Sequence, residues 1–320
     1  MRLCIRQGTH LWLGVLLSGL LTGCSSLRLT PPLAALPDNI PAAVELSETP
    51  FFPQEQNHCG PAALATLLNQ RQINVSPETL AKRTYLPGLK GSLQIELTAT
   101  ARQYGLLVYP LSGRLNDLLS EVAAGNPVLI LQNQAFRWFP RWHYAVVVGY
   151  NLHRQELILR SGRERRWVTD FQTFRNTWQR ADNWGILTLP TDTVPATASV
   201  LTYLGAANDL AMSNQATAAH LAYQTATKQW PEDAMAWLTL GNSAYTKAEW
   251  QLAVDAFQAA VKLAPENPAA WNNLAYALLA LEHSDAAIAA IEQALVISPE
   301  DPNLLDSRQE ILRRTSQPEM

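Results

Sequence analysis

The chain has 320 residues, with 24 Lys and Arg against 27 Asp and Glu, which gives a net charge of -3. Because this balance is nearly neutral and no run of five basic residues occurs, nucleic acid is not expected as a partner. The length that remains after an N-terminal leader suits two modest domains.

The first 23 residues are predicted to be a signal peptide. Basic Arg2 and Arg6 precede an apolar run from Leu11 to Leu21. That run is shorter than the roughly 20 residues needed to cross a bilayer, so it has the length of a signal-peptide core.

The leader ends in Leu21-Thr22-Gly23-Cys24, which resembles the lipobox of bacterial lipoproteins. This resemblance implies that Cys24 is lipidated and becomes the first residue of the mature protein. Ser25 stands where an inner-membrane retention signal has Asp, which implies an outer-membrane anchor facing the periplasm. The alternative is an ordinary anchor helix with an incidental cysteine.

Residues 24–50 are predicted to be a tether between membrane and domain. Prolines recur through them, among them Pro31, Pro37 and Pro41, and proline stiffens a chain and disfavours helix.

Residues 51–190 change from helical to strand-like patterns along the chain, which predicts an α+β domain. Ser76-Pro77 has the pattern of a helix start, with Ser as cap and Pro at the first position. Helices are also expected over 60–70, 92–104 and 115–124, and strands over 128–131, 144–150, 156–160, 165–169 and 184–189.

Cys59 is the candidate nucleophile. It stands directly before the first predicted helix, where unpaired N–H groups and the helix dipole favour a thiolate. Gly60 permits close approach to a substrate, and Pro61 suits the first turn. Cys4 and Cys24 belong to the leader and the lipidation signal, so Cys59 has no disulfide partner. The alternative is a buried thiol that only packs.

His143 is the candidate proton acceptor, because it lies at the entrance of a Val-rich strand and so on a rigid element. Metal binding through His58 and Cys59 is not expected, since adjacent side chains diverge and no other Cys or His has zinc-site spacing. No cofactor is expected either. The other histidines are assigned to the surface or to packing: His153, His220 and His283.

Gln54 before Cys59, Cys-Gly-Pro opening a helix, and a His followed by a Val-rich strand ending in Gly resemble the bacteriocin-processing (double-glycine) peptidases. These peptidases belong to the papain-like superfamily, and the resemblance covers about residues 50–190. It implies a papain-like α+β fold in which Cys59 attacks a carbonyl, His143 transfers the proton and Gln54 helps to hold the oxyanion.

The third catalytic position departs from that family, which usually places an Asp at the end of the strand after the His strand. Ser161 stands there. It can accept a hydrogen bond from the imidazole, but it cannot stabilise imidazolium as a carboxylate would. Asn151 and Asp170 are the alternatives.

An aromatic cluster surrounds His143 and has two interpretations. Packing in the core is the default, and a hydrophobic wall for the substrate is the alternative. Its members are Phe136, Trp138, Phe139, Trp142 and Tyr144.

After a linker over residues 191–199, the chain repeats with a period of 34. Trp237 and Trp271 are 34 residues apart, and so are Pro231, Pro265 and Pro299. This pattern resembles the tetratricopeptide repeat, which implies an all-α solenoid. Repeats are expected over 200–231, 234–265 and 268–299, with a capping helix that completes a domain of residues 200–314. The first repeat departs most, with Tyr203 in place of Trp, and is expected to pack on the preceding domain.

Together these features predict a membrane-tethered cysteine peptidase that hydrolyses peptide bonds in exported peptides or proteins. The repeats would recruit the substrate or a protein partner on their concave face. The alternative is a lipoprotein scaffold that binds peptides without cutting them, which the missing Asp favours. A third class, a transglutaminase-like or cell-wall amide hydrolase, lacks a recognisable wall-binding module.

Overall fold

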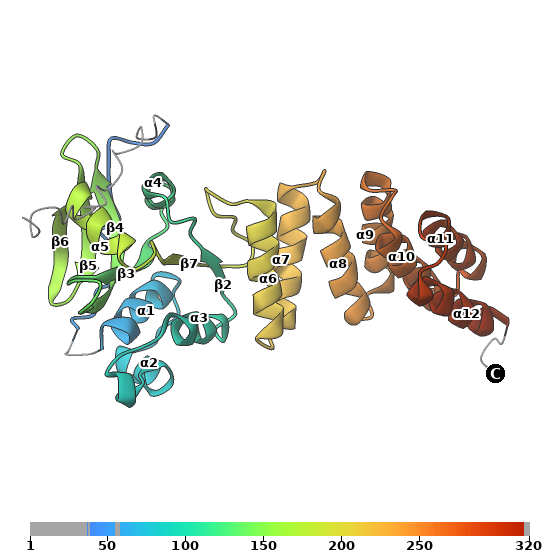
Figure 1. Ribbon diagram of the computed structural model, residues 1–320, viewed down its shortest axis with the longest axis horizontal. Coiled ribbons are helices and arrows are strands. Elements are labelled where there is room, and N and C mark those ends of the chain that lie inside the picture. The colour runs from blue at the N-terminus through green and yellow to red at the C-terminus, as the bar shows by residue number, and fades with distance from the viewer. Residues whose placement is uncertain (1–36, 38, 55–57, 317–320) are drawn as a thin grey trace, which may run out of the picture. The chain divides into compact units, whose positions relative to one another are not determined.

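The computed structural model describes residues 37, 39–54 and 58–316 (Figure 1). The predicted signal peptide, Cys24 and most of the predicted tether lie outside these residues. Among the residues that the structure describes, no helix is long and apolar enough to cross a membrane.

An antiparallel sheet organises the N-terminal domain. Within the described residues it has seven strands. Six follow the order β2-β7-β3-β4-β5-β6, and the seventh, β1, pairs with the C-terminal end of β4. The strands are β1 (Ala43–Glu45), β2 (Leu107–Pro110), β3 (Val128–Asn133), β4 (Trp142–Asn151), β5 (Glu156–Ser161), β6 (Glu164–Asp170) and β7 (Gly185–Leu189).

Helices complete the domain and confirm the predicted α+β class. Tyr144, Val146 and Val148 of β4 share a core with the long helix α1. Side chains alternate along a strand, so Ala145 and Val147 point to the opposite face of the sheet. The helices are α1 (Cys59–Gln70), α2 (Pro77–Thr84), α3 (Gln94–Arg102), α4 (Leu115–Ala123) and α5 (Phe171–Gln179), with a 3-10 turn η1 (Pro87–Leu89).

Local sequence signals explain where several of these elements begin. The Ser76 side chain caps α2 by accepting the Thr79 N–H, and Pro77 occupies the first turn, as predicted. Helix α5 was not predicted. It begins after Asp170, whose carboxylate accepts the Thr173 N–H at 2.8 Å.

The sheet starts inside the range predicted to be a tether. Strand β1 pairs with β4 so closely that a Cβ on Gly149 would lie 2.6 Å from the Val44 carbonyl oxygen. The buried Arg160 guanidinium also donates to the backbone oxygens of Ser47 and Thr49. Residues 43–49 therefore belong to the folded domain, because backbone pairing and Arg160 hold them there.

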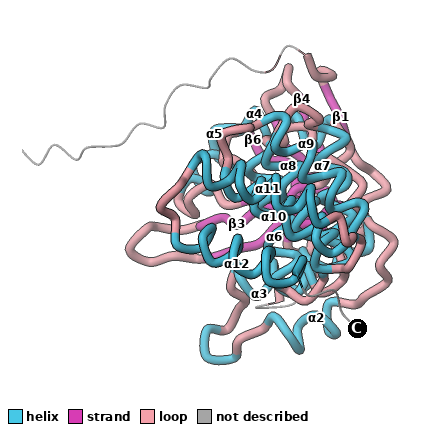
Figure 2. Tube along the Cα trace, turned by 90° about the vertical axis from the view of Figure 1, so that its right-hand side faces the viewer, coloured by secondary structure: helices cyan, strands magenta, loops and turns pink. Residues whose placement is uncertain are grey.

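Helices alone follow the last strand (Figure 2). They form pairs over each predicted repeat range and end in the predicted capping helix, which confirms the repeat solenoid. The helices are α6 (Val200–Met212), α7 (Ala216–Gln229), α8 (Ala234–Thr246), α9 (Trp250–Leu263), α10 (Pro268–Ala280), α11 (Ser284–Ile297) and α12 (Pro302–Ser316).

The predicted linker is held against the N-terminal domain by one buried carboxylate. Glu121 on α4 accepts hydrogen bonds from the Thr197 N–H at 2.7 Å and the Thr197 hydroxyl at 2.6 Å. It also accepts from the Ala196 N–H at 3.3 Å and the Asn126 amide at 2.9 Å. All four partners are donors, so the carboxylate acts only as an acceptor, and the segment is fixed rather than loose.

The first repeat packs against the N-terminal domain, as expected for an atypical end repeat. Helix α6 contacts β2, and Arg102 forms an ion pair with Asp209 at 2.5 Å. The Tyr203 hydroxyl donates to the Thr191 carbonyl at 3.1 Å. His220 is buried in packing, where it bonds to Ser243 at 3.0 Å.

Gly241 tests the close helix crossing on which the repeats depend. A Cβ there would lie 2.5 Å from the Phe257 ring. We expect Gly241→Ala to lower the free energy of unfolding by about 1–3 kcal/mol through overpacking. Gly205→Ala is the matched control, because its Cβ would meet no atom within 4 Å, and it should be neutral or stabilising. Chemical denaturation measures both, and equal effects would contradict the packing argument.

Candidate functional site

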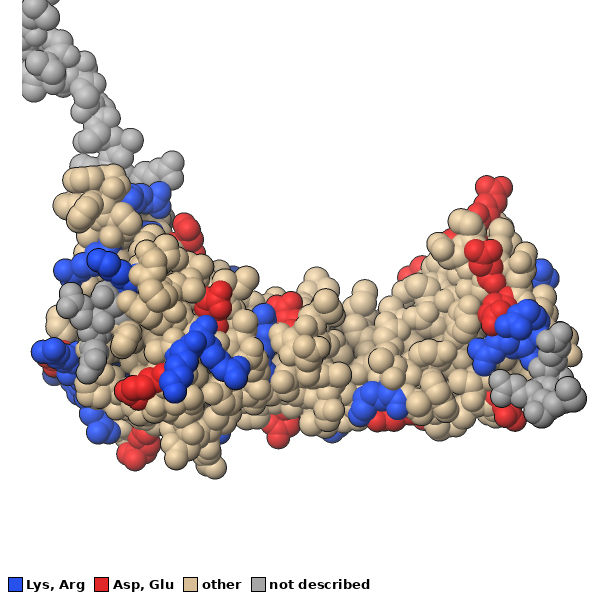
Figure 3. Space-filling model, turned by 90° about the horizontal axis from the view of Figure 1, so that it is seen from below, with Lys and Arg blue, Asp and Glu red and all other residues tan. Residues whose placement is uncertain are grey.

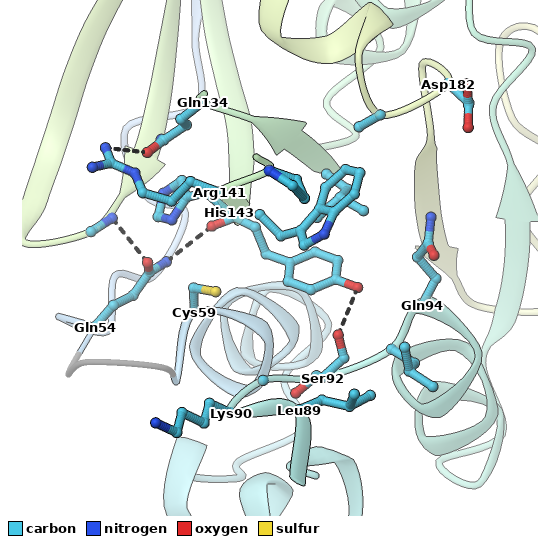
Figure 4. A pocket seen from close by; sticks show the side chains of 18 of the residues that line it. Gln54, Cys59, Leu89, Lys90, Ser92, Gln94, Gln134, Arg141, His143 and Asp182 are labelled. Atoms are coloured by element: carbon cyan, nitrogen blue, oxygen red, sulfur yellow. Dashed lines mark hydrogen bonds between the residues drawn. The ribbon is translucent and has the colours of Figure 1, made fainter. Parts of the chain in front are cut away.

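Cys59 opens α1 and faces a cleft of about 1130 Å³. Gln54, His143 and Gly162 line the same cleft, so the structure brings the predicted nucleophile, base and oxyanion residue together. Figure 4 shows Cys59 beside Gln54 and below His143. The thiol is half-buried, and it is free.

The thiol experiences two opposing effects. Burial raises the pKa of Cys59, and hydrogen bonds from the backbone of Tyr144, Gly60 and Cys59 itself lower it. Burial is the larger effect, so the pKa lies above its ordinary value and the thiol is neutral at pH 7. The helix start provides the N–H groups that the sequence predicted, yet they do not outweigh desolvation.

Gln54 is held in a fixed orientation from both ends of its amide. Its Oε1 accepts the Gly162 N–H at 3.1 Å, and its Nε2 donates to the Tyr144 carbonyl at 3.4 Å. The Gln54 backbone N–H also donates to the Gly162 carbonyl at 2.9 Å. An amide has two N–H donors, so the Gln54 side chain has a second donor beyond the one given to the Tyr144 carbonyl.

Ser161 is the residue that orients His143. Its hydroxyl lies 2.8 Å from His143 Nε2, so Nδ1 is the ring nitrogen that this hydrogen bond leaves unused. The two alternatives are engaged elsewhere. Asn151 accepts the Arg154 N–H at 3.0 Å, and Asp170 caps α5.

His143 is neutral in this environment. Burial lowers its pKa to about 4, and the positive charge of Arg141 adds to the effect. Among the described residues no carboxylate bonds to the ring, and the Ser161 hydroxyl bonds to its Nε2 instead. At rest both the Cys59 thiol and the His143 imidazole are therefore neutral.

Tyr144 and Ser92 are site residues that the sequence analysis did not identify as such. The Tyr144 hydroxyl donates to the Ser92 carbonyl at 3.1 Å, across the cleft floor. A Cβ on Gly60 would lie 2.8 Å from Ser92 Cβ and 3.4 Å from the Tyr144 ring, so only glycine fits beside Cys59. The Cys-Gly-Pro motif was the available signal for this crowding.

The aromatic cluster divides at Tyr144, which is buried while the others are exposed. Trp138 is 82% exposed and Phe139 is 70% exposed. Core packing, the default interpretation, is therefore wrong for the four residues before it, because they lie at the tip and base of the β3–β4 hairpin. Those four are Phe136, Trp138, Phe139 and Trp142.

Comparisons with known families identify both parts of the chain. Residues 46–186 match the Peptidase C39 like family, and residues 204–264 and 238–302 match the tetratricopeptide repeat. The chain therefore contains a peptidase C39-like domain followed by tetratricopeptide repeats.

The chain is also partly similar to several solved structures. A putative C39-like peptidase from Bacillus anthracis is 19% identical, with a TM-score of 0.40 over 46% of this chain and 97% of that one. The first repeat domain of Spaghetti, bound to an HSP90 peptide, is 15% identical, with a TM-score of 0.35 over 37% and 94%. MamA is 22% identical, with a TM-score of 0.33 over 37% and 75%. No curated protein matches the chain.

The side chain at position 161 should control the charge states of His143 and Cys59. In Ser161→Asp a carboxylate beside His143 favours imidazolium, so the thiolate forms at lower pH. We expect the pH profile of Cys59 alkylation to move down by about one pH unit or more. Iodoacetamide labelling of the full chain, with Cys4 and Cys24 replaced by Ser, measures it.

Ser161→Asn is the matched control, because its side chain has the size of Asp without the charge. Its alkylation profile should stay close to that of the wild type. Identical profiles for the Asp and Asn variants would show that the imidazole does not respond to this position.

Proposed function

We propose that the N-terminal domain is a cysteine peptidase that hydrolyses peptide bonds in exported peptides or proteins. The observation that carries the proposal is the convergence of Cys59, His143 and Gln54 on one cleft, with His143 held by Ser161. Cys59 attacks the scissile carbonyl as its proton moves to His143 Nδ1, and the imidazolium then protonates the leaving amine. Water hydrolyses the resulting thioester and restores the thiol.

A second candidate function is peptide binding without cleavage. The observations that favour it are the neutral thiol–imidazole pair and the hydroxyl in place of a carboxylate at Ser161. The same cleft would then hold a peptide beside Cys59. We rank the peptidase first, because binding alone gives no role to an orienting hydrogen bond on His143 or to the fixed amide of Gln54.

The repeats are proposed to recruit the substrate or a protein partner to this domain. The support is their family, since such arrays bind other proteins and perform no chemistry themselves. Their attachment fits that role, because Glu121 and the contact of α6 with β2 hold the first repeat to the catalytic domain.

Replacing either Cys59 or His143 tests the proposed peptidase activity. We expect Cys59→Ala to abolish turnover and His143→Ala to lower kcat by about 10²-fold or more, since general acid–base catalysis supplies that factor. Mass spectrometry of a peptide library incubated with the full chain measures cleavage. Thermal melting shows whether each variant folds. Cleavage by Cys59→Ala would contradict the mechanism, and absence of turnover by the wild type would favour the scaffold.

The chain is further proposed to be lipid-anchored through Cys24 in the bacterial cell envelope, at the outer membrane facing the periplasm. The support is the lipobox-like sequence before Cys24. We expect Cys24→Ser to move the protein from the membrane fraction to the soluble fraction, measured by immunoblotting. Cys4→Ser is the matched control and should leave the distribution unchanged. An unchanged distribution for Cys24→Ser would contradict the anchor.

A further inference from the structure

The cleft that holds Cys59 has an excess of positive charge. Among the residues that the structure describes, its charged lining residues are Lys90, Arg141 and Arg163 against a single carboxylate, Asp182. None of the three cations has an ion-pair partner among the described residues. Arg141 donates to the neutral Gln134 side chain at 3.0 Å. The cleft therefore presents cations whose charge the rest of the described chain does not neutralise.

These charges are distributed unequally along the cleft. Figure 4 shows Lys90 and Arg141 at the end where Gln54 and Cys59 lie, and Asp182 at the opposite end. Arg163 lies beside Gly162, whose N–H bonds to Gln54, so it belongs to the same end. A bound peptide would therefore meet positive charge on the side of the cleft nearest to the thiol.

The N-terminal domain as a whole is also basic, whereas the repeat domain is acidic. Residues 46–186 contain 15 Lys and Arg against 10 Asp and Glu, whereas residues 204–302 contain 3 against 11. On the face seen in Figure 3, Lys and Arg side chains gather over the N-terminal domain. A basic domain with a cationic cleft attracts anionic ligands and raises their local concentration.

Large apolar side chains border the cleft on two sides. The β3–β4 hairpin carries Trp138, which stacks on Phe136 with ring centroids 5.5 Å apart, and Trp142 lines the cleft itself. The opposite border carries Leu89 and Leu93, which are 63% and 42% exposed. Exposed apolar groups of this size mark a binding surface, because monomeric proteins seldom leave them uncovered together.

We propose that this cleft selects acidic peptide segments. Asp or Glu would lie beside the reactive carbonyl at the end held by Lys90, Arg141 and Arg163, and a large apolar side chain would pack on the hairpin aromatics. As a statement about a substrate, this inference rests on the proposed peptidase function. As a statement about binding, it can be measured without turnover.

Binding of matched peptides to the full-length Cys59→Ala protein tests the inference. Each fluorescent peptide carries Asp and Glu, or Asn and Gln at the same positions, next to a Trp or Phe. We expect the acidic peptide to bind about tenfold more tightly in fluorescence anisotropy at low ionic strength, since several weak pairs act together. The preference should decrease as salt screens the charges. Equal affinities for the acidic and amide peptides would overturn the inference.

Single substitutions locate the preference in the cleft. Lys90 and Arg163 lie on different loops. Lys90→Gln and Arg163→Gln should each reduce the ratio of the affinity for the acidic peptide to that for the amide peptide by several-fold. Lys262→Gln is the matched control, because Lys262 is exposed on α9 and its loss changes the net charge equally. If Lys262→Gln reduces the ratio as much as the cleft variants do, net charge rather than the cleft determines binding, and the inference fails.

Turnover separates this inference from the proposed function. If the wild type cuts peptides but the Cys59→Ala protein binds acidic and amide forms equally, the inference fails and the peptidase stands. If acidic peptides bind in a manner that depends on Lys90 and Arg163 but none is cut, the peptidase fails and the selection stands as that of a binding domain.

Discussion

The site depends on the placement of Tyr144, which is buried at the point where β4 passes the start of α1. Its hydroxyl donates to the Ser92 carbonyl, its own carbonyl accepts the Gln54 amide, and its ring packs edge-on against Trp184 at 5.9 Å. Its backbone also bonds to the Cys59 thiol. Tyr144 thus sets the spacing between Cys59 and Gln54. Strand β4 carries His143 on the adjacent residue.

The chemistry that this placement permits is limited by desolvation. The helix start and three backbone hydrogen bonds favour a thiolate, but burial disfavours charge on both Cys59 and His143. A carboxylate beside the ring would favour an ion pair between thiolate and imidazolium, whereas here the Ser161 hydroxyl bonds to the ring without adding charge. The domain therefore has a cysteine peptidase-like fold in which both Cys59 and His143 are neutral at rest.

The fold and three of the site residues could be predicted from sequence because their signals are local. Cys59 precedes a helix, His143 precedes a Val-rich run, and the 34-residue period recurs along the repeats. The roles of Tyr144 and Ser92 could not be predicted, because they depend on contacts across 52 residues of chain. Similarly, the exposure of Trp138 depends on where the β3–β4 hairpin turns, and the aromatic residues themselves do not indicate that position.

The turn between β5 and β6 has a mechanical consequence. The Ser161 hydroxyl forms a hydrogen bond with the His143 imidazole. The next residue, Gly162, bonds to Gln54 through its own backbone N–H and its own carbonyl. A displacement of this one turn would move the base and the oxyanion donor at the same time. The proposed peptidase activity should therefore be lost or regained in one step. A molecule that binds this turn from outside the cleft would act as an allosteric inhibitor.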